Sequence, residues 1–412
     1  MRIAIWYNLP SGGAKRALYR HVRGLLERGH EVEAWCPPSA DRDFLPLTDL
    51  IPEHVRPLDG AVDASRYAQT GRPLSWRELA SATRTDIIEM DRHSKVCADE
   101  VNAGGFDVFF GNACTFYGVS SVGRRVDIPS VLYLPEPLRR LHEAMPNHPF
   151  AAEASGPVSV RHVRARLASV RVAESKRVQV REEIANARAY QRILVNSLHT
   201  RESVLRAYGL DSHVCYLGVD ADEFSDWGND REPVAVGIGA IVWEKNIPFI
   251  LRAISELGRR DLRLVWVGNY ADPHVLLEAQ TMARDLKVDF EARVLLSDDD
   301  LIGVLNRASV FVYAPRLEPF GLAPLEAAAC GLPTVAVAEG GARETILSGR
   351  TGLLTENDEG EFASAVSSLL TNDAQRVEMG RAAREWVLDR WTTAHAAARL
   401  EAHLLAVVGA DP

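Results

Sequence analysis

The sequence predicts an α/β protein of two doubly wound domains that face each other across a cleft. Three observations lead to this class. The chain has 412 residues, which is long for a single hydrophobic core. Short β-rich runs alternate with helical stretches, and this alternation stops and restarts once. The polar, acidic and turn-rich segment 218–232 between the two series is typical of a hinge.

The first series opens with a strand, a Gly-rich turn, a helix and a second strand. The apolar run 2–9 predicts the first strand, and the helix that follows should end at Gly29. The run 31–36 predicts the second strand, so this order implies a parallel sheet. Further strands are predicted at 108–110, 130–134, 193–196 and 214–217.

The second series repeats the pattern, with strands predicted at 234–241, 262–267, 293–296, 310–314 and 334–338. The last helix, near 386–408, has no strand after it. We therefore predict a first domain over 1–217, a second domain over 218–385, and a C-terminal helical segment over 386–412 that is a candidate to pack back on the first domain.

The composition points to a cytoplasmic protein. The net charge of −9 argues against a general nucleic-acid-binding protein. Five cysteines without a C-x-x-C pair predict free thiols in a reducing compartment. The N-terminus meets Pro and Gly too soon for a signal peptide, and no run approaches the ~18 apolar residues of a membrane span.

A basic helical pattern over 158–192 departs from the α/β rhythm. One interpretation is a cationic face that contacts an anionic acceptor or, peripherally, the inner face of a membrane. The other is a solvated helix whose Val/Leu stripe packs on the first domain. The sequence leaves both open.

The segment EPFGLAPLEAAACG, 318–331, predicts a helix that begins near Ala323 and Pro324 without a capping side chain. It lies at the carboxyl end of a predicted parallel strand, where ligands bind in such sheets. The amides of Phe320, Gly321 and Leu322 would therefore form an anion site at the positive end of the helix.

Glu318 and Glu326 lie on either side of this helix start. A carboxylate repels a bound anion, so the presence of two acids beside an anion site has to be explained. Glu326 could accept hydrogen bonds from a ribose diol, and Glu318 from the hydroxyls of a second sugar. A diol, a diphosphate and a sugar together describe a nucleotide-sugar. The alternative is that the acids only favour a helix N-terminus, by ~0.3–1 kcal/mol each, which does not explain Glu318 before Pro319.

The segment EPFGLAPLEAAACGLPTVA resembles the signature of the retaining GT-B glycosyltransferases of family 4, or glycosyltransferase group 1. Four other segments resemble further motifs of this family in the same order: SGGAKRAL, NSLHTRESV, GVDADEF and EGGARETI. The resemblance covers most of the chain. It implies two Rossmann-like domains, the first on the acceptor side and the second binding the nucleotide-sugar.

The resemblance also implies roles for particular residues. Glu318 would bind the donor sugar, Glu326 the donor ribose, and Lys245 the diphosphate together with the three bare amides. Gly12 and Gly13 would let the backbone of the first domain approach the same phosphates. The family usually has an Arg where this chain has Ala240, and the candidates to replace that cation are Arg316 and Arg343.

A second departure lies after the fourth strand, where the family often has a His and this chain has Pro135. The neighbouring Glu136 and Arg139 are candidates for the acceptor side. The alternative is a Pro-bounded loop with solvated charges.

The resulting hypothesis is a hexosyltransferase that uses a nucleotide-sugar, a UDP-sugar rather than a GDP-sugar, and a glycan, lipid or small-molecule acceptor. We expect no cofactor and no metal, because the run Asp298, Asp299 and Asp300 is better explained as the start of a helix capped by Ser297. Two alternatives are a nucleotide-sugar-binding protein without transferase activity and a GT-B-like sugar-nucleotide epimerase or hydrolase.

Overall fold

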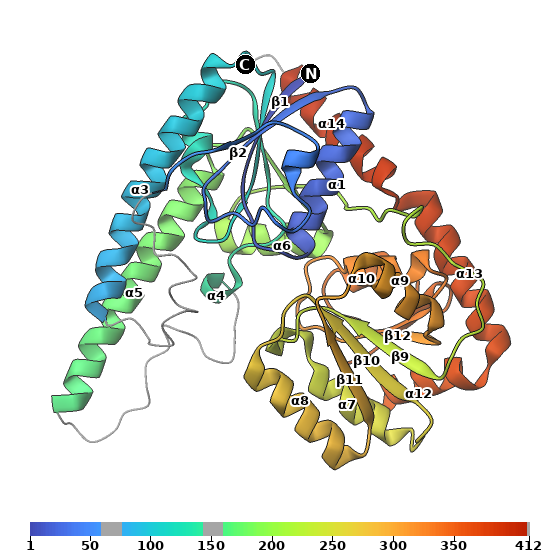
Figure 1. The fold of residues 1–412 in the computed structure, drawn as a ribbon. Helices are drawn as coiled ribbons and strands as arrows, with labels where there is room; N and C mark the ends of the chain where they lie inside the picture. The colour runs from blue at the N-terminus through green and yellow to red at the C-terminus, as the bar shows by residue number, and fades with distance from the viewer. Residues whose placement is uncertain (59–75, 143–159, 410–412) are drawn as a thin grey trace. The chain divides into compact units, whose positions relative to one another are not determined.

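A computed structural model describes residues 1–58, 76–142 and 160–409. The chain forms two compact units (Figure 1). The N-terminal unit comprises Met1–Val195, Thr200–Cys215 and Leu400–Pro412, and the C-terminal unit comprises Asn196–His199 and Tyr216–Arg399. Each unit contains a sheet of mainly parallel strands with helices packed against it, which confirms the predicted α/β class.

The sheet of the N-terminal unit has the order β3-β2-β1-β4-β6-β7-β8, and all these neighbours pair in parallel. The short β5 pairs antiparallel with β4. The predicted first two strands are confirmed, whereas β3 and β5 were not predicted. The strands are β1 (Arg2–Asn8), β2 (Glu31–Cys36), β3 (Glu53–Val55), β4 (Val108–Cys114), β5 (Gly118–Val119), β6 (Ser130–Tyr133), β7 (Arg192–Val195) and β8 (His213–Val214).

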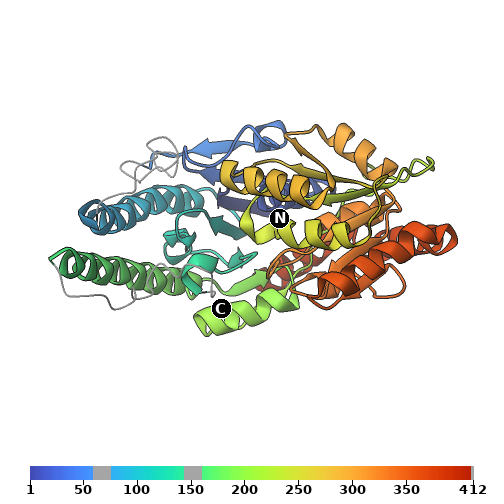
Figure 2. The ribbon, with the colours of Figure 1, turned by 90° about the horizontal axis from the view of Figure 1, so that it is seen from below.

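Two long helices of this unit, α3 and α5, lie side by side (Figures 1 and 2). Of the basic helix predicted over 158–192, residues 158 and 159 lie outside the described residues. The predicted helix is too long at its C-terminal end, because α5 ends at Ala187 and Arg192 already belongs to β7. The helix ends here because Tyr190 turns into the core and stacks on Phe109. The helices are α1 (Gly13–Glu27), α3 (Trp76–Ala103), α4 (Arg139–His142), α5 (Val160–Ala187) and α6 (Leu198–Tyr208), with short 3₁₀ turns η1 (Leu47–Asp49) and η2 (Ser121–Arg124).

The sheet of the C-terminal unit is parallel throughout, with the order β11-β10-β9-β12-β13-β14. The strand predicted at 293–296 is wrong in position, because the observed strand β11 covers Asp289–Val294. It is an edge strand in which charged residues alternate with apolar ones, so it lacks the continuous apolar run used for the prediction. Arg263 of β10 donates a hydrogen bond to Asp289 of β11. The strands are β9 (Val234–Ile238), β10 (Arg263–Gly268), β11 (Asp289–Val294), β12 (Val310–Tyr313), β13 (Thr334–Val337) and β14 (Gly352–Thr355).

Helices pack on this sheet around a core that includes Trp266, Phe249 and Phe362. The 3₁₀ turn η3 (Trp243–Lys245) precedes the first of them. The helices are α7 (Ile247–Glu256), α8 (Pro273–Leu286), α9 (Asp298–Arg307), α10 (Leu322–Ala329), α11 (Ala342–Thr345), α12 (Glu359–Thr371), α13 (Asp373–Arg390) and α14 (Thr393–Val408).

The single C-terminal helix predicted within 386–412 is instead two helices, α13 and α14. The break falls at Trp391 and Thr392, because this stretch pairs with Val219: Val219 N–H donates to the Trp391 carbonyl at 2.7 Å, and Thr393 N–H donates to the Val219 carbonyl at 3.0 Å. The end of α14 belongs to the N-terminal unit, where Glu401 accepts a 2.8 Å hydrogen bond from Arg28.

None of the helices in the described ranges has the length and apolar composition needed to span a membrane.

Candidate active site

The topology of the C-terminal unit places two loops beside each other. Its strand order reverses between β9 and β12, and in open parallel sheets ligands bind at such a switch point, beyond the carboxyl ends of the strands. The loop after β9 carries Lys245, and the loop after β12 carries Glu318.

The structure brings these two residues together in an ion pair, with Lys245 Nζ 2.6 Å from Glu318 Oε2. Both side chains are partly accessible, at 20% and 21% of their full exposure. An ion pair in contact with water contributes only about 0–1 kcal/mol. A ligand could therefore separate the pair by offering an anion to Lys245 and hydroxyl groups to Glu318.

Gly239 provides the surface on which the Lys245 side chain lies. A Cβ atom at Gly239 would come within 2.9 Å of Lys245 Cε, and the Gly239 φ of 149° is rarely adopted by other residues. The Trp266 indole N–H donates to the Gly239 carbonyl at 2.8 Å and fixes this loop on β10. The position of the Lys245 ammonium therefore depends on a glycine that the sequence analysis did not select.

The residues next to the ion pair have left-handed backbones. Asn246 has φ 54° and Leu317 has φ 49°, and such a conformation in a non-glycine residue costs about 1–3 kcal/mol. Arg316 connects the two loops: its N–H donates to the Glu244 carbonyl at 2.8 Å, and its guanidinium donates to Asn246 Oδ1 at 3.1 Å.

The structure locates both cations considered as replacements for the missing charge at Ala240. The Arg316 guanidinium lies over the Trp243 ring, 3.8 Å from its centre, in a polar cavity of ≈ 490 Å³ that Asn246 also lines. Arg343 is exposed and donates to the Gly340 carbonyl. Arg316 thus contacts the same loop as Lys245, whereas Arg343 points to the last glycine loop.

The helix that follows Glu318 begins without a side-chain cap, as predicted. It starts at Leu322, one residue before the predicted start, and Gly321 at its N-cap has φ 95°. Within residues 1–58, 76–142 and 160–409, no group accepts a hydrogen bond from the amides of Phe320, Gly321 or Leu322. Such amides at a helix N-terminus can bind an anion.

Glu326 and the Phe320 side chain of this segment are buried. Glu326 is the fifth residue of α10 and is 5% exposed, so it lies beyond the first turn. The Phe320 ring packs in an aromatic cluster with Tyr216 and Trp391, with centroid distances of 6.2 and 5.8 Å. The Phe320 side chain therefore anchors the loop and leaves its amide as the group available to a ligand.

Three contacts hold the loop 317–320 and were missed at the sequence level. The Gly341 N–H donates to the Glu318 carbonyl at 2.8 Å, the Ser197 hydroxyl donates to the Pro319 carbonyl at 2.5 Å, and Glu339 accepts from the Leu317 N–H at 3.1 Å. The motifs NSLHTRESV and EGGARETI, which contain Ser197, Glu339 and Gly341, were the signal that could have identified them.

Glu344, in the second of these motifs, accepts hydrogen bonds from the amides of Leu198 and His199 at 2.8 and 3.0 Å. It also accepts one from the Tyr216 hydroxyl at 2.9 Å, and burial followed by this carboxylate raises the Tyr216 pKa to about 12. A carboxylate from α11, far away in the sequence, thus caps the start of α6.

In the N-terminal unit, the helix α1 also begins at glycines without a side-chain cap in the described chain. Gly12 is the N-cap with φ 131°, and a Cβ atom at Gly13 would meet no atom within 4 Å. Lys15 is fully buried behind this loop and donates to the Tyr7 hydroxyl at 3.2 Å. Burial lowers the Lys15 pKa.

The acceptor-side candidates Glu136 and Arg139 pair with each other, with Arg139 Nε 2.6 Å from Glu136 Oε2. The Thr200 hydroxyl donates to the carbonyl of Pro135 at 3.2 Å. This loop is therefore fixed on α6, while its role towards an acceptor stays a prediction.

The three acids at the start of α9 occupy its first turn, as predicted from their context. Ser297 is the N-cap and accepts a 3.1 Å hydrogen bond from the Asp300 N–H.

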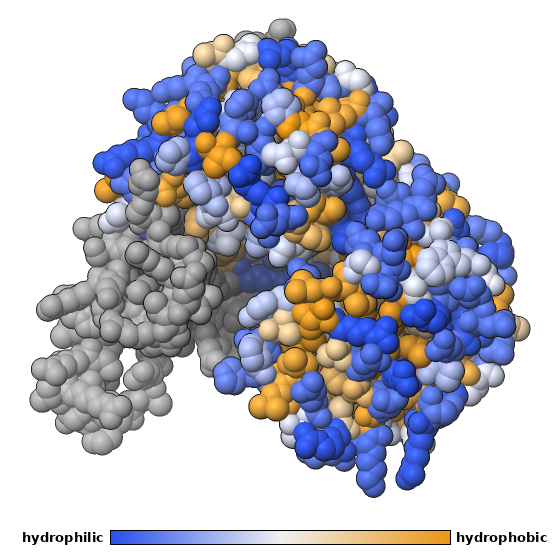
Figure 3. Space-filling view, viewed as in Figure 1, coloured by the Kyte–Doolittle hydropathy of each residue, from blue (hydrophilic) through white to orange (hydrophobic). Residues whose placement is uncertain are grey.

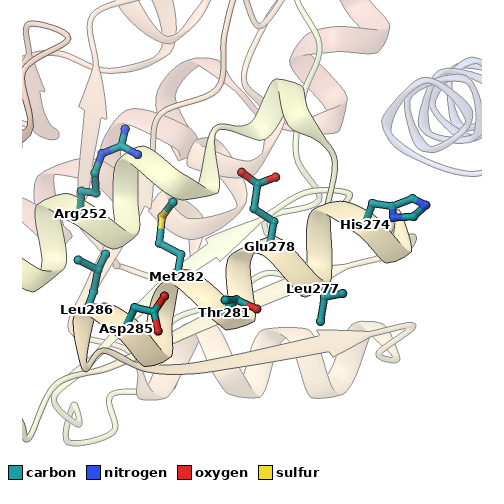
Figure 4. Close-up of a pocket in the computed structure, with 8 residues that line it drawn as sticks. All are labelled: Arg252, His274, Leu277, Glu278, Thr281, Met282, Asp285 and Leu286. Atoms are coloured by element: carbon teal, nitrogen blue, oxygen red, sulfur yellow. The ribbon is translucent and has the colours of Figure 1, made fainter.

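A further cavity of ≈ 500 Å³ lies between α7 and α8 (Figure 4). Hydrophobic residues gather at the surface around α8 (Figure 3). Leu277, which belongs to α8, is largely exposed. None of the residues predicted for the nucleotide-sugar site lines this cavity; its lining residues are Arg252, His274, Leu277, Glu278, Thr281, Met282, Asp285 and Leu286.

Comparison with solved structures shows the class of fold. The Anabaena protein HepE in complex with UDP and glucose matches with a TM-score of 0.69, 16% identity, and coverage of 98% of this chain and 99% of that one. Sucrose-phosphate synthase from Thermosynechococcus elongatus matches with a TM-score of 0.70, 17% identity and coverage of 98% and 99%. The chain has the GT-B fold.

Sequence comparison shows which proteins the second half of the chain is similar to. Residues 220–386 match the model of Glycosyl transferases group 1. A GDP-mannose-dependent alpha-(1-6)-phosphatidylinositol monomannoside mannosyltransferase from Mycolicibacterium smegmatis is 33% identical over 229 residues, 50% of this chain and 59% of the relative. A D-inositol 3-phosphate glycosyltransferase from Corynebacterium kroppenstedtii is 28% identical over 238 residues, 52% of each chain. The chain thus spans little more than half the length of these relatives.

Proposed function

We propose that this chain is a cytoplasmic, retaining hexosyltransferase that moves a sugar from a nucleoside diphosphate sugar to a hydroxyl group of a glycan, lipid or small-molecule acceptor. The observation that supports this proposal most is the Lys245–Glu318 pair beside the uncapped start of α10, at the switch point of the C-terminal sheet. Both groups and the bare amides belong to one unit.

In the proposed reaction, the bond between the sugar C1 and the diphosphate oxygen breaks, and a bond forms between C1 and the acceptor oxygen. The acceptor attacks from the face that the diphosphate leaves, and its hydroxyl proton passes to a diphosphate oxygen. Lys245 and the amides of Phe320, Gly321 and Leu322 stabilise the charge on the leaving group, because these donors are already oriented before the reaction. Glu318 accepts hydrogen bonds from the sugar, and Glu326 from the ribose.

In this proposal, Gly12 and Gly13 allow the backbone before α1 to approach the diphosphate, and Glu136 and Arg139 contact the acceptor. The open space around Gly13 supports the first assignment. The ion pair between Glu136 and Arg139 supports the acceptor assignment, because it fixes two polar groups that can form hydrogen bonds with an acceptor.

The donor is tested by incubating the protein with UDP- and GDP-sugars and candidate acceptors, and by separating the products by chromatography. The names of the relatives suggest the first compounds to test. The donors are GDP-mannose and the UDP-sugars expected from the sequence, and the acceptors are a phosphatidylinositol mannoside and inositol phosphate. A glycosylated product with the anomeric configuration of the donor supports the proposal. Free sugar without a glycosylated product would indicate a hydrolase, and tight binding without turnover would indicate a binding protein.

The same assay tests metal independence. Because the proposal assigns the leaving-group charge to Lys245 and the helix amides, added EDTA should leave the rate unchanged. Loss of transfer in EDTA that returns with a divalent cation would contradict it.

A lipid acceptor would bring the enzyme to a membrane, so the peripheral contact predicted for 158–192 belongs with this proposal. In the described part of α5, Arg177 and Arg181 are exposed and lie 3.8 and 3.7 Å from Glu174 and Glu182. Co-sedimentation with anionic vesicles, compared with neutral vesicles, tests this contact; equal sedimentation would exclude it.

A further inference from the structure

We propose that Glu339 is a positioning residue for Glu318 and acts through the backbone of Leu317. This inference rests on the proposed function, because it assigns to Glu339 the placement of a carboxylate that binds the donor sugar. Glu339 follows β13, whereas Leu317 and Glu318 follow β12, the neighbouring strand in the sheet.

The first step is the conformation of Leu317. Its φ of 49° lies in the left-handed region, which an L-residue with a side chain rarely adopts. A backbone in this conformation persists only where surrounding contacts hold it, and such residues gather at functional sites. Leu317 directly precedes Glu318, so a change of its φ would redirect the Glu318 side chain.

The second step is the contact that holds this backbone. Glu339 Oε1 accepts a 3.1 Å hydrogen bond from the Leu317 N–H. A carboxylate is a stronger acceptor for an N–H group than a neutral oxygen. The Glu339 backbone is itself fixed, because its N–H donates to the Val337 carbonyl at 2.8 Å.

The third step is the fixed backbone on the other side of Glu318. The Gly341 N–H donates to the Glu318 carbonyl, and a Cβ atom at Gly340 would lie 2.2 Å from that carbonyl oxygen. Glu339 and these two glycines are consecutive in the chain. One loop therefore holds the backbone both before and at Glu318, and only Glu339 does so with a side chain.

The experiment compares Glu339→Ala, Glu339→Gln and the double variant Leu317→Gly with Glu339→Ala. Glu339→Ala should lower kcat for transfer at least tenfold with a smaller change in the donor KM, and Glu339→Gln should retain most of the activity because its amide oxygen can accept the same hydrogen bond. Leu317→Gly should restore at least a third of the rate lost in Glu339→Ala, since glycine adopts the left-handed conformation without a side-chain clash.

Leu295 provides the matched control, because it is another leucine with a left-handed backbone, φ 61°, at the end of β11. Leu295→Gly should not restore Glu339→Ala. A wild-type kcat in the Glu339→Ala variant would overturn the inference. The inference is also overturned if Glu339→Ala lowers kcat and the added Leu317→Gly does not restore it, because Glu339 would then act directly and not through the Leu317 backbone.

A wild-type protein without transfer would count against the proposed function and not against this inference. The nucleotide-sugar Kd of the same variants, measured by calorimetry, then decides it: weaker binding in Glu339→Ala that Leu317→Gly restores supports the inference, and an unchanged Kd overturns it.

Discussion

At the scale of the residue, the site consists of groups that partner one another before any ligand arrives. Lys245 and Glu318 form a partly accessible ion pair at 2.6 Å, and the backbone on either side of this pair is left-handed. The pair contributes little to stability because solvent screens it. In the proposed function, the pair places a cation and a carboxylate within reach of one ligand.

Lys245→Met and Glu318→Gln should therefore lower the rate of transfer while leaving the stability of the fold nearly unchanged. Each should lower transfer by about 10²-fold or more, the range found when one preorganised charge-stabilising donor is removed. The melting temperature should change by only a few degrees, as expected for a loss of at most about 1 kcal/mol. Glu278→Gln, in the cavity between α7 and α8, serves as control. Wild-type turnover in either site variant would contradict the assignment.

His21 predicts a pH dependence of stability that is independent of the site. It is fully buried beside Phe110 and Tyr133, and burial lowers its pKa from 6.5 to about 4. Neither ring nitrogen has a hydrogen-bond partner in the described part of the chain. The unfolded chain binds a proton between pH 6.5 and 4 that the folded chain does not, so stability is full above pH 6.5 and falls towards pH 4, by about 3 kcal/mol in total.

His21→Leu removes this titration, so unfolding measured by calorimetry should depend less on pH between 6.5 and 4 than in the wild type. An identical slope in both proteins would contradict the assignment of this proton to His21.

At the scale of the element, the loops after β9, β12 and β13 form one assembly. Arg316 joins the first two, and the loop 339–341 packs on the backbone of Glu318 and Phe320 so closely that positions 340 and 341 have room only for glycine. A Cβ atom at Gly341 would lie 2.5 Å from Phe320 Cα. The uncapped start of α10 is therefore held by backbone contacts and not by a capping side chain.

Gly340→Ala tests this contact against a matched glycine. Gly340 and Gly349 both have positive φ, 58° and 78°, but a Cβ atom meets the Glu318 carbonyl only at Gly340 and open space at Gly349. Both substitutions should cost about 1 kcal/mol of backbone strain, and Gly340→Ala should cost a further 1–3 kcal/mol of overpacking and most of the activity. Equal stability and activity of the two variants would contradict the proposed packing.

Local patterns were sufficient to predict most of the elements, because buried parallel strands are continuous apolar runs such as 310–313. These patterns failed where contacts between residues far apart in the sequence determine the bounds of an element. The edge strand β11 alternates charged and apolar residues, and the break before α14 depends on the pairing of Thr392 with Val219, 173 residues earlier. The bare start of α10 could be predicted because the absence of a capping residue is visible in the sequence. The motifs around Glu339 and Ser197 were visible in the sequence, but their contacts could not be predicted, since their partners are backbone groups brought near by the fold.

At the scale of the whole molecule, the C-terminal unit carries Lys245, Glu318, Glu326 and the bare amides, whereas the glycine loop at Gly12 and Gly13 belongs to the N-terminal unit. A ligand that binds only the folded protein raises its stability by about 2.7 kcal/mol at 100 times its Kd. A nucleoside diphosphate should therefore raise the melting temperature of the protein, and the corresponding nucleoside at the same concentration should not.

The most direct test of the central claim is calorimetric titration of the wild type and Lys245→Met with GDP and UDP, and with the matching monophosphates and nucleosides. One diphosphate should bind at least tenfold more tightly than its nucleoside, and Lys245→Met should remove most of that difference, because the proposed function assigns the diphosphate to the ammonium together with the amides of Phe320, Gly321 and Leu322. Equal affinity for the diphosphate and the nucleoside, or an unchanged preference in Lys245→Met, would contradict the claim.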